Sequence, residues 1–200
     1  MAASNFKAAG CRGWRLSGGF FAAGLVAAFT LVLQVLCAHA GQNLHGRVVR
    51  VTDGDTIVVE DSDRRRHKVR IVSIDAPEKG RRDRAGQPYA ERSRQHLALL
   101  VETKQVRLVT RGYDDYGRVL ASVRVAGAES ESEVDVGLAQ VCAGYAWLYE
   151  MFANTLSPGE QRVYRACQSA ARRDKRGLWR ADDPIPPWVW RHAGSGAGVR

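Results

Sequence analysis

Three short acidic segments carry residue types that could hydrolyse a phosphodiester bond. In "VTDGDTIVVE" (51–60), Asp53 and Asp55 flank a glycine between two β-branched runs. The other two segments are "DAPE" (75–78) and "YDDYGRV" (113–119). Each alone fits an ordinary turn or loop, since Asp-Gly is a common two-residue hairpin turn. One turn acid would serve that purpose, so the second carboxylate at Asp55 indicates an additional role.

Together, the three segments supply the components of phosphodiester hydrolysis. Clustered carboxylate and carbonyl oxygens form a site for a hard divalent cation such as Ca²⁺ or Mg²⁺. Two arginines can pair with phosphate oxygens and stabilise the negative charge of a five-coordinate transition state. A further carboxylate can take a proton from the attacking water or orient it. The sequence has no CxxC, His-rich tract or HExxH, so it gives no support to a zinc or thiol-redox site.

The elements that must position these groups are short strands followed by helices. The strand candidates are 45–51, 56–60, 67–74, 105–110 and 118–125. Strands that precede helices favour an α+β fold, and five short strands joined by turns suit a small barrel such as the OB-fold. Arg70 lies within the third strand, which runs into Asp75 and Glu78, and functional groups often lie on loops held by a rigid sheet.

Three helices are expected around this barrel. The first begins at Pro88 and has one face formed by Tyr89, Ser93, Leu97 and Leu100. The second ends at Gly144, and its stripe is Val134, Leu138, Val141 and Cys142. The third begins with a capping box at 157–160, and its stripe is Val163, Ala166, Cys167 and Ala170.

Cys142 and Cys167 therefore point inward from two different helices. If these helices pack together, a disulfide between them is feasible in an oxidising compartment. The alternative is a pair of small buried thiols that behave as apolar side chains.

We expect residues 1–40 to be a secretory signal peptide. A basic lead without acidic residues precedes an apolar run at 20–38, and "AHA" at 38–40 offers the small residues that signal peptidase requires. Cleavage would release a mature chain, beginning near Gly41, into the periplasm or the medium. The alternative is an uncleaved membrane anchor, because the apolar run has the roughly 17–25 residues that span a bilayer.

The chain is basic even without this segment. Removing its three basic residues lowers the formal net charge from +9 to +6. Much of the excess lies in "RRRHK" (64–68) and "KGRRDR" (79–84). Such runs form either solvated faces or a positive field for a polyanion such as nucleic acid.

The order D-G-D-T, then R-x₄-D-x-P-E, then D-x-Y-G-R resembles the staphylococcal nuclease (thermonuclease) family. The likeness extends from about His45 to Trp179 and includes "GLW" at 177–179. It implies an OB-fold barrel with three helices that cleaves DNA and RNA with Ca²⁺. We therefore expect a nuclease-like domain at 41–180. A tail at 181–200 would be rich in proline and tryptophan and then flexible, with its tryptophans packed on the domain or touching a partner.

The resemblance implies a metal site at the first two motifs. Asp55 and Asp75 would be direct Ca²⁺ ligands, with the main-chain carbonyl of Ala76 as a third. Asp53 would lie in the outer shell, and Thr56 would support the site by a hydrogen bond.

The resemblance also assigns the catalytic groups. Glu78 would be the general base or would orient the attacking water. Arg70 and Arg118 would hold the scissile phosphate.

Substrate contacts are implied less directly. Asp115 stands where the family has a lysine, which should weaken binding of a terminal phosphate and leave Tyr116 as the contact. An aromatic residue that stacks on a base should lie near 146–152, and Tyr149 is our choice.

Two functions follow from these observations. One is a secreted Ca²⁺-dependent nuclease of low sequence specificity, acting on DNA and, as a second substrate, RNA. The other is a non-catalytic OB-fold module that binds nucleic acid or protein. Such modules commonly lose a metal ligand or an arginine, whereas this chain keeps Arg70, Asp55, Asp75, Glu78 and Arg118. We expect the enzyme, as a monomer without an obligate protein partner, at a membrane only if the signal stays uncleaved.

Overall fold

The computed structural model describes residues 43–82, 84–127 and 132–193. The expected signal segment and residues 194–200 of the tail lie outside these ranges. Within the described part of the chain, no helix is long and apolar enough to cross a lipid bilayer.

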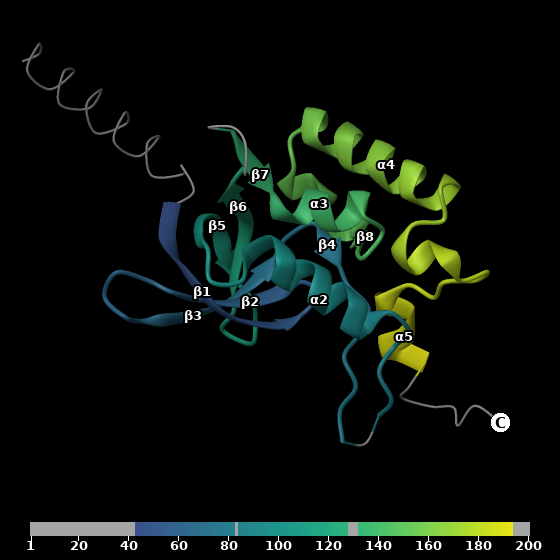
Figure 1. Cartoon of the computed structure of the whole chain (residues 1–200), viewed down its shortest axis with the longest axis horizontal. Helices are drawn as coiled ribbons and strands as arrows, with labels where there is room; N and C mark the ends of the chain where they lie inside the picture. The colour runs from purple at the N-terminus through teal and green to yellow at the C-terminus, as the bar shows by residue number, and fades with distance from the viewer. Residues whose placement is uncertain (1–42, 83, 128–131, 194–200) are drawn as a thin grey trace, which may run out of the picture. The chain divides into compact units, whose positions relative to one another are not determined.

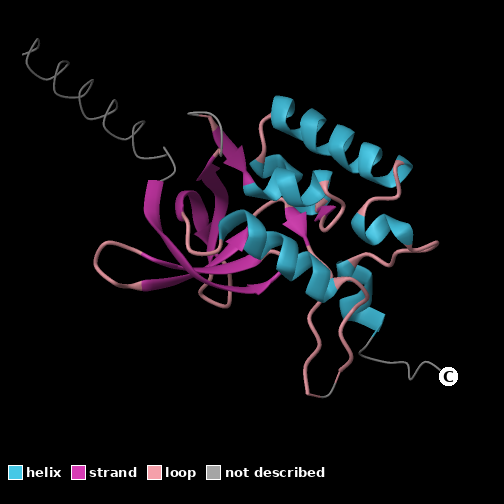
Figure 2. Cartoon of the chain, viewed as in Figure 1, coloured by secondary structure: helices cyan, strands magenta, loops and turns pink. Residues whose placement is uncertain are grey.

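Five strands form a closed barrel, and the helices gather on one side of it (Figures 1 and 2). The strands are β1 (Asn43–Asp53), β2 (Thr56–Glu60), β3 (Arg66–Ile71), β5 (Gln105–Tyr113) and β6 (Val119–Ala126). They follow the order β3-β2-β1-β5-β6, and a parallel pairing of β3 with β6 closes the barrel. A short strand, β7 (Glu133–Asp135), extends the sheet beside β6. The predicted α+β fold with a five-stranded OB-type barrel is confirmed.

The predicted strand at 67–74 is interrupted, because β3 ends at Ile71 and the chain turns at Val72 and Ser73. Ser73 has φ 66°, which lies in the left-handed region and breaks the strand. Beyond this turn, β4 (Ile74–Asp75) pairs with β8 (Trp147–Leu148), and Asp75 lies opposite Trp147. The turn therefore takes Asp75 out of the barrel wall and next to the helical part of the molecule.

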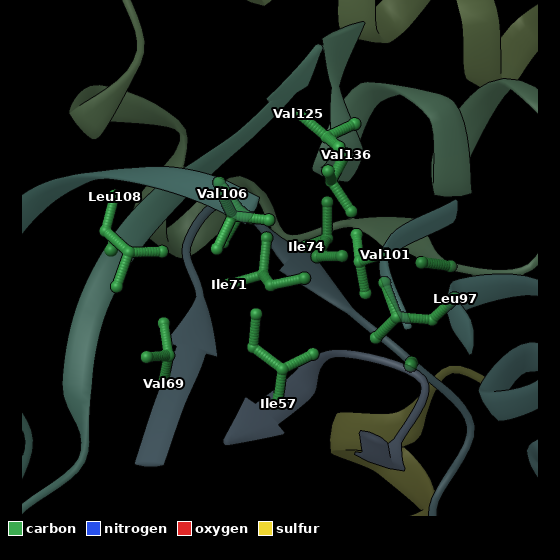
Figure 3. Packing of buried hydrophobic residues seen from close by; sticks show 14 of the residues in the cluster. Ile57, Val69, Ile71, Ile74, Leu97, Val101, Val106, Leu108, Val125 and Val136 are labelled. Carbon is green, nitrogen blue, oxygen red and sulfur yellow. The ribbon is translucent and has the colours of Figure 1, made fainter. Parts of the chain in front are cut away.

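The barrel interior is filled by aliphatic side chains (Figure 3). Ile57 and Val69 come from the barrel strands, and Leu97 and Val101 come from α2 (Ala90–Val101). All four side chains are fully buried. Burial of one such side chain contributes about 1.5–3 kcal/mol to folding.

The apolar faces of the later helices differ from the prediction. Val134 belongs to strand β7 and not to the second helix, α3, which spans Val136–Cys142. The third helix, α4 (Pro158–Arg173), begins with the predicted capping box, but Val163 is 48% exposed. Tyr164 faces the core instead, since its hydroxyl donates a hydrogen bond to Asp135 Oδ1 at 2.9 Å. The hydrogen bond to Asp135 thus favours burial of Tyr164 rather than Val163.

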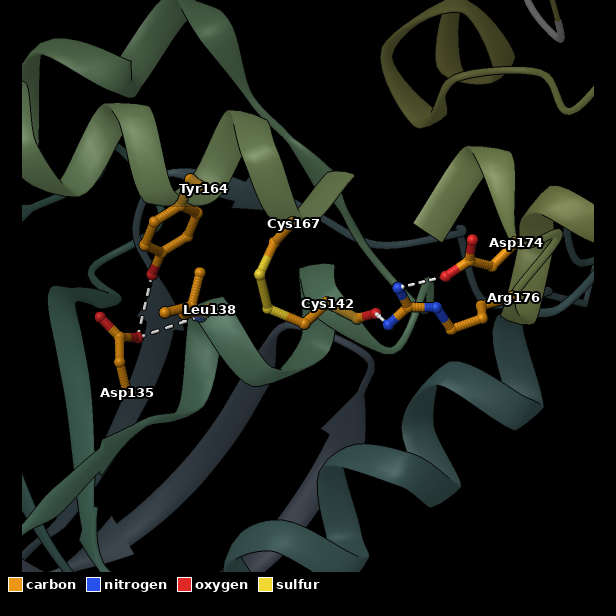
Figure 4. The surroundings of a disulfide bond; sticks show 7 residues. All are labelled: Asp135, Leu138, Cys142, Tyr164, Cys167, Asp174 and Arg176. Atoms are coloured by element: carbon orange, nitrogen blue, oxygen red, sulfur yellow. Dashed lines mark hydrogen bonds and ion pairs between the residues drawn. A yellow bond between two sulfur atoms is a disulfide. The ribbon is translucent and has the colours of Figure 1, made fainter. Parts of the chain in front are cut away.

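A disulfide joins α3 to α4 (Figure 4). Cys142 and Cys167 have their sulfur atoms 2.04 Å apart and their Cα atoms 4.6 Å apart. Next to it, Arg176 donates a hydrogen bond to the Cys142 carbonyl at 2.6 Å. Two short 3-10 helices, η1 (Glu150–Thr155) and η2 (Gly177–Arg180), flank α4 along the chain.

The C-terminal segment contains a helix that the sequence analysis did not predict. Helix α5 (Pro187–Ala193) follows the proline-rich stretch. Trp188 packs edge-on against Trp147, with ring centroids 5.7 Å apart, and stacks on Tyr149 at 5.3 Å. The packing brings α5 close to β8 and thus to the end of β4.

Candidate active site

The "DGDT" segment forms the turn between β1 and β2. Asp53 pairs with Thr56 across the hairpin, so Gly54 and Asp55 are the two turn residues. A Cβ atom at Gly54 would lie 1.9 Å from Ser93 Oγ on α2, a distance that no side chain can occupy. Glycine is therefore needed here because the helix approaches the turn closely.

Arg70 on β3 brings two of the predicted metal ligands together. It pairs with Thr56 in the sheet, which places it beside the turn. Its Nη1 forms an ion pair with Asp55 Oδ2, and its Nη2 donates to Asp75 Oδ1 at 2.8 Å. The side chains are 15% exposed for Arg70, 11% for Asp55 and 1% for Asp75. Two buried carboxylates, one from the β1–β2 turn and one from β4, thus share one guanidinium.

Asp55 is held as an ionised carboxylate. It accepts hydrogen bonds from Thr56 Oγ1 and from the main-chain N–H of Ala76, both at 2.9 Å. Burial alone would raise its pKa, but the positive charge of Arg70 and the hydrogen bond from the Ala76 N–H outweigh burial and lower the pKa. The supporting hydrogen bond predicted for Thr56 is thus present.

Asp53 lies next to Asp55 in a less favourable environment. Burial, followed by the negative charge of Asp55 and a hydrogen bond to it, raises the pKa of Asp53 to about 7. Its Oδ1 is buried and has no hydrogen-bond partner among the described residues. A buried acceptor of this kind requires an ordered water or an ion. Asp53 also lines a pocket of about 350 Å³ together with Lys79.

Glu78 and Asp75 contact a cation that the sequence analysis missed. Arg191 on α5 donates from Nη1 to Glu78 Oε1 at 2.5 Å and from Nη2 to Asp75 Oδ2 at 2.8 Å. Its Nη1 also lies 3.2 Å from Asp75 Oδ1. Burial raises the pKa of Asp75 more than the hydrogen bond from Arg191 and the charge of Arg70 lower it.

Arg118 directly precedes β6, the strand that closes the barrel against β3. The register places Val119 opposite Val69 and Leu120 opposite Arg70. Arg118 thus lies two residues before Leu120, the partner of Arg70 in the sheet. Its Nε donates to Asp114 Oδ2 at 2.6 Å, so Asp114 orients the guanidinium.

The predicted substrate-contacting tyrosines lie in two different places. Tyr116 is 85% exposed, and the Arg118 guanidinium lies 5.5 Å from its ring. Asp115 is exposed beside it. Tyr149 lies after β8, stacks on Trp188 and lines a pocket of about 630 Å³ with Met151.

The acids fit a metal ion that prefers oxygen ligands. Asp55 and Asp75 converge on one guanidinium, and the Asp53 oxygen without a partner lies beside them. No group of three or more His, Cys, Asp or Glu side chains in the described ranges is arranged to hold a metal. The main-chain oxygen of Ala76 as a further ligand stays a prediction. Carboxylate and carbonyl oxygens are the ligands of hard divalent cations.

Gln140 is a second residue that the sequence analysis missed. It is fully buried on α3, and its Nε2 donates to the carbonyl oxygens of Gly54 at 2.7 Å and of Ser93 at 3.2 Å. These bonds fix the acidic turn against α2 and α3. A glutamine within an apolar helical stripe was the only signal of this role.

Known proteins are similar to this chain in sequence. The staphylococcal nuclease homologue family matches residues 68–181. An uncharacterized endonuclease of Escherichia coli is 43% identical over 164 residues, which cover 82% of this chain and 93% of that protein. The chain belongs to the staphylococcal nuclease family. A micrococcal nuclease of Shigella flexneri is 32% identical over 179 residues, or 88% of this chain and 96% of that protein. An uncharacterized endonuclease of Haemophilus influenzae is 32% identical over 167 residues, 84% of each chain.

The family match covers Arg70, Asp75, Glu78 and Arg118, while the acidic turn precedes it. The protein is therefore a nuclease of the staphylococcal type, and nucleic acid is its substrate. Nucleases of this family are generally metal-dependent.

Proposed function

We propose that this nuclease depends on Ca²⁺ and hydrolyses DNA, with RNA as a second substrate, at low sequence specificity. One observation carries the proposal: Asp55 and Asp75 converge on Arg70 in a buried cluster, and Glu78 lies beside it through Arg191. This cluster supplies metal ligands, a phosphate-binding cation and a base within one small region.

The donor set favours Ca²⁺ as the metal. Asp55, Asp75 and the carbonyl of Ala76 would hold the ion. Ca²⁺ accepts irregular sets of carboxylate and carbonyl oxygens, whereas Mg²⁺ demands a near-ideal octahedron. When bound, the ion supplies positive charge to a phosphate oxygen.

The remaining groups act directly on the substrate. Arg70 and Arg118 donate hydrogen bonds to oxygens of the scissile phosphate and stabilise the charge that develops there. Glu78 accepts the proton of the attacking water, or orients that water by accepting a hydrogen bond from it. Asp114 keeps the Arg118 guanidinium in place through its ion pair at 2.6 Å.

Low specificity follows from the kind of contacts that these residues make. Contacts to phosphate carry no sequence information. The Tyr149 ring can stack on any base, because every base has a π-face. The excess of Lys and Arg over Asp and Glu, 30 against 21, attracts either nucleic acid.

We also propose that the protein is exported, to the periplasm or the medium, with a membrane-anchored form as the alternative. The basic and apolar pattern of residues 1–40 supports export. A disulfide between Cys142 and Cys167 suits an oxidising compartment. The mass of the purified protein from cells tests this, since a chain that still begins near Met1 would contradict cleavage.

A nuclease assay tests the proposed activity. Purified protein is incubated with plasmid DNA, single-stranded DNA and RNA, in Ca²⁺, in Mg²⁺ and in EGTA. We expect cleavage of DNA and RNA in Ca²⁺ and its loss in EGTA. Equal cleavage rates in Ca²⁺ and EGTA would contradict the metal dependence.

Substitution of the phosphate-binding arginine tests the assigned roles. Arg118→Ala should lower kcat by about 10²–10³, as expected for the loss of one transition-state contact. Arg107→Ala on β5 is the matched control, because Arg107 also forms an exposed ion pair, with Glu133. A loss below about tenfold for Arg118→Ala would refute its role.

A further inference from the structure

The C-terminal helix α5 is fixed against the edge of the active site. Trp188 packs against both Trp147 and Tyr149. Gln87 Nε2 donates to the Ile185 carbonyl at 2.5 Å, and Arg84 donates to the main chain of α5. Gln87 Oε1 also accepts a hydrogen bond from the N–H of Glu78 at 3.0 Å. The segment that holds α5 is thus the same one that carries Glu78.

This anchoring holds the Arg191 guanidinium against two acids of the proposed site, Asp75 and Glu78. Arg191 contacts both oxygens of Asp75 and one oxygen of Glu78, at distances of 2.5–3.2 Å. Its side chain is 37% exposed, whereas that of Asp75 is 1% exposed. The guanidinium therefore reaches from solvent to an acid that is otherwise buried.

The contacts of Arg191 use the oxygen lone pairs that a metal ion requires. A carboxylate offers about four acceptor sites. Asp75 already gives one to Arg70 and two to Arg191. A dication bound to Asp75 would also stand within a few ångströms of the Arg191 charge, and like charges at that distance repel strongly in a buried site. Arg191 and a divalent cation therefore compete for Asp75.

We propose that Arg191 is an internal competitor for the metal, which must leave Asp75 and Glu78 before the active site is complete. The inference rests on the proposed metal site and goes beyond it. While Arg191 holds Asp75 and Glu78, it compensates their charge and occupies the proposed base. When the metal binds, Arg191 leaves both acids. The Glu78 carboxylate is then free to accept a hydrogen bond from the attacking water. Arg191 is thus a positioning residue that sets the metal affinity and the state of the base.

Calcium binding to the full-length protein, measured by isothermal titration calorimetry, tests the competition without an activity assay. The variants are Arg191→Gln, Arg191→Lys and the matched control Arg107→Gln, which removes the same charge from the Glu133 pair. We expect Arg191→Gln to bind Ca²⁺ at least about tenfold more tightly, which corresponds to about 1.4 kcal/mol. Arg191→Lys should stay near the wild type, because it restores the charge, and Arg107→Gln should be unchanged.

A second measurement follows the helix itself. Hydrogen exchange of the α5 amides should become faster in the wild type when Ca²⁺ is added, because Arg191 loses its partners. Trp188→Ala, which weakens the packing of α5 but keeps Arg191, should also bind Ca²⁺ more tightly, since the effective concentration of the guanidinium at Asp75 falls. Near-ultraviolet circular dichroism shows that each variant is folded.

The possible outcomes distinguish a failure of the proposed competition from a failure of the proposed metal site. Equal Ca²⁺ affinities of wild type, Arg191→Gln and Trp188→Ala, with α5 exchange unchanged by Ca²⁺, would overturn the competition alone. No Ca²⁺ binding by either the wild type or Arg191→Gln would overturn the metal site and the competition together.

Discussion

Replacement of Arg70 by methionine should destabilise the protein and should do so less when Ca²⁺ is present. Methionine removes the charge with a similar chain length. It leaves Asp55 and Asp75 buried without their shared partner, because these side chains are only 11% and 1% exposed. Removal of one member of a buried ion pair typically costs about 3–5 kcal/mol. Arg191 still pairs with Asp75, so we expect a loss of about 3 kcal/mol in EGTA.

Calcium should offset part of this loss. Without Arg70 the acids carry less compensated charge, so the variant should bind the dication more tightly than the wild type does. If the variant binds Ca²⁺ tenfold more tightly, saturating Ca²⁺ reduces the stability gap, the difference in unfolding free energy between wild type and variant, by about 1.4 kcal/mol. The gap should then fall from about 3 to about 1.6 kcal/mol. Catalysis should not recover, because the phosphate contact of Arg70 is lost and kcat falls by about 10²–10³.

Urea unfolding followed by circular dichroism measures the gap, with wild type and variant each in EGTA and in saturating Ca²⁺. Arg107→Met is the control, since exposed pairs contribute only about 0.2–1 kcal/mol. The reasoning would be refuted by a gap below about 1 kcal/mol in EGTA, or by a gap that Ca²⁺ leaves unchanged.

Four further outcomes can be measured. Glu78→Gln should lower kcat by about 10²–10³ while the protein still binds Ca²⁺ in calorimetry, and wild-type turnover would contradict its role as base. Cys142→Ser should lower the free energy of unfolding by about 3.5 kcal/mol, from the 25-residue separation to Cys167, and two thiols titrating in unreduced wild type would contradict the disulfide. Gly54→Ala should lower the melting temperature, because its methyl group would meet Ser93 Oγ at 1.9 Å, and a wild-type melting temperature would contradict the close approach. DNA binding should weaken as salt rises, and an affinity independent of salt would contradict the phosphate contacts.

Features encoded within a few residues were predictable from the sequence. The Asp53–Thr56 turn depends on glycine and two acids in four positions, and the structure pairs its ends as expected. The α4 cap depends on Ser157 and Glu160, and both of its reciprocal hydrogen bonds are present. In each case the residues that determine the geometry are neighbours in the sequence, so the local pattern is sufficient.

Features that depend on distant partners were predicted poorly. β7 has three residues and pairs with β6, and β8 has two residues and pairs with β4. Strands this short show no hydrophobic periodicity in the sequence. Hydrophobicity alone placed Val163 on the buried face of α4. Tyr164 is buried instead, because Asp135 accepts a hydrogen bond from its hydroxyl. The partner element determines which residues pair and which are buried, and the sequence of one segment does not reveal that partner.

Arg191 shows the same limit at the active site. It lies 113 residues from Glu78 and 116 from Asp75, in a segment with no motif of its own. Its position depends on the packing of Trp188 and on the main-chain contacts of α5, which are properties of the folded chain. In the mechanism that we propose, the motifs specify which oxygens bind the metal, and the tail sets how strongly they bind it. Two members of this family with identical motifs should differ in metal affinity wherever their tails place a different charge at the acid that ends β4.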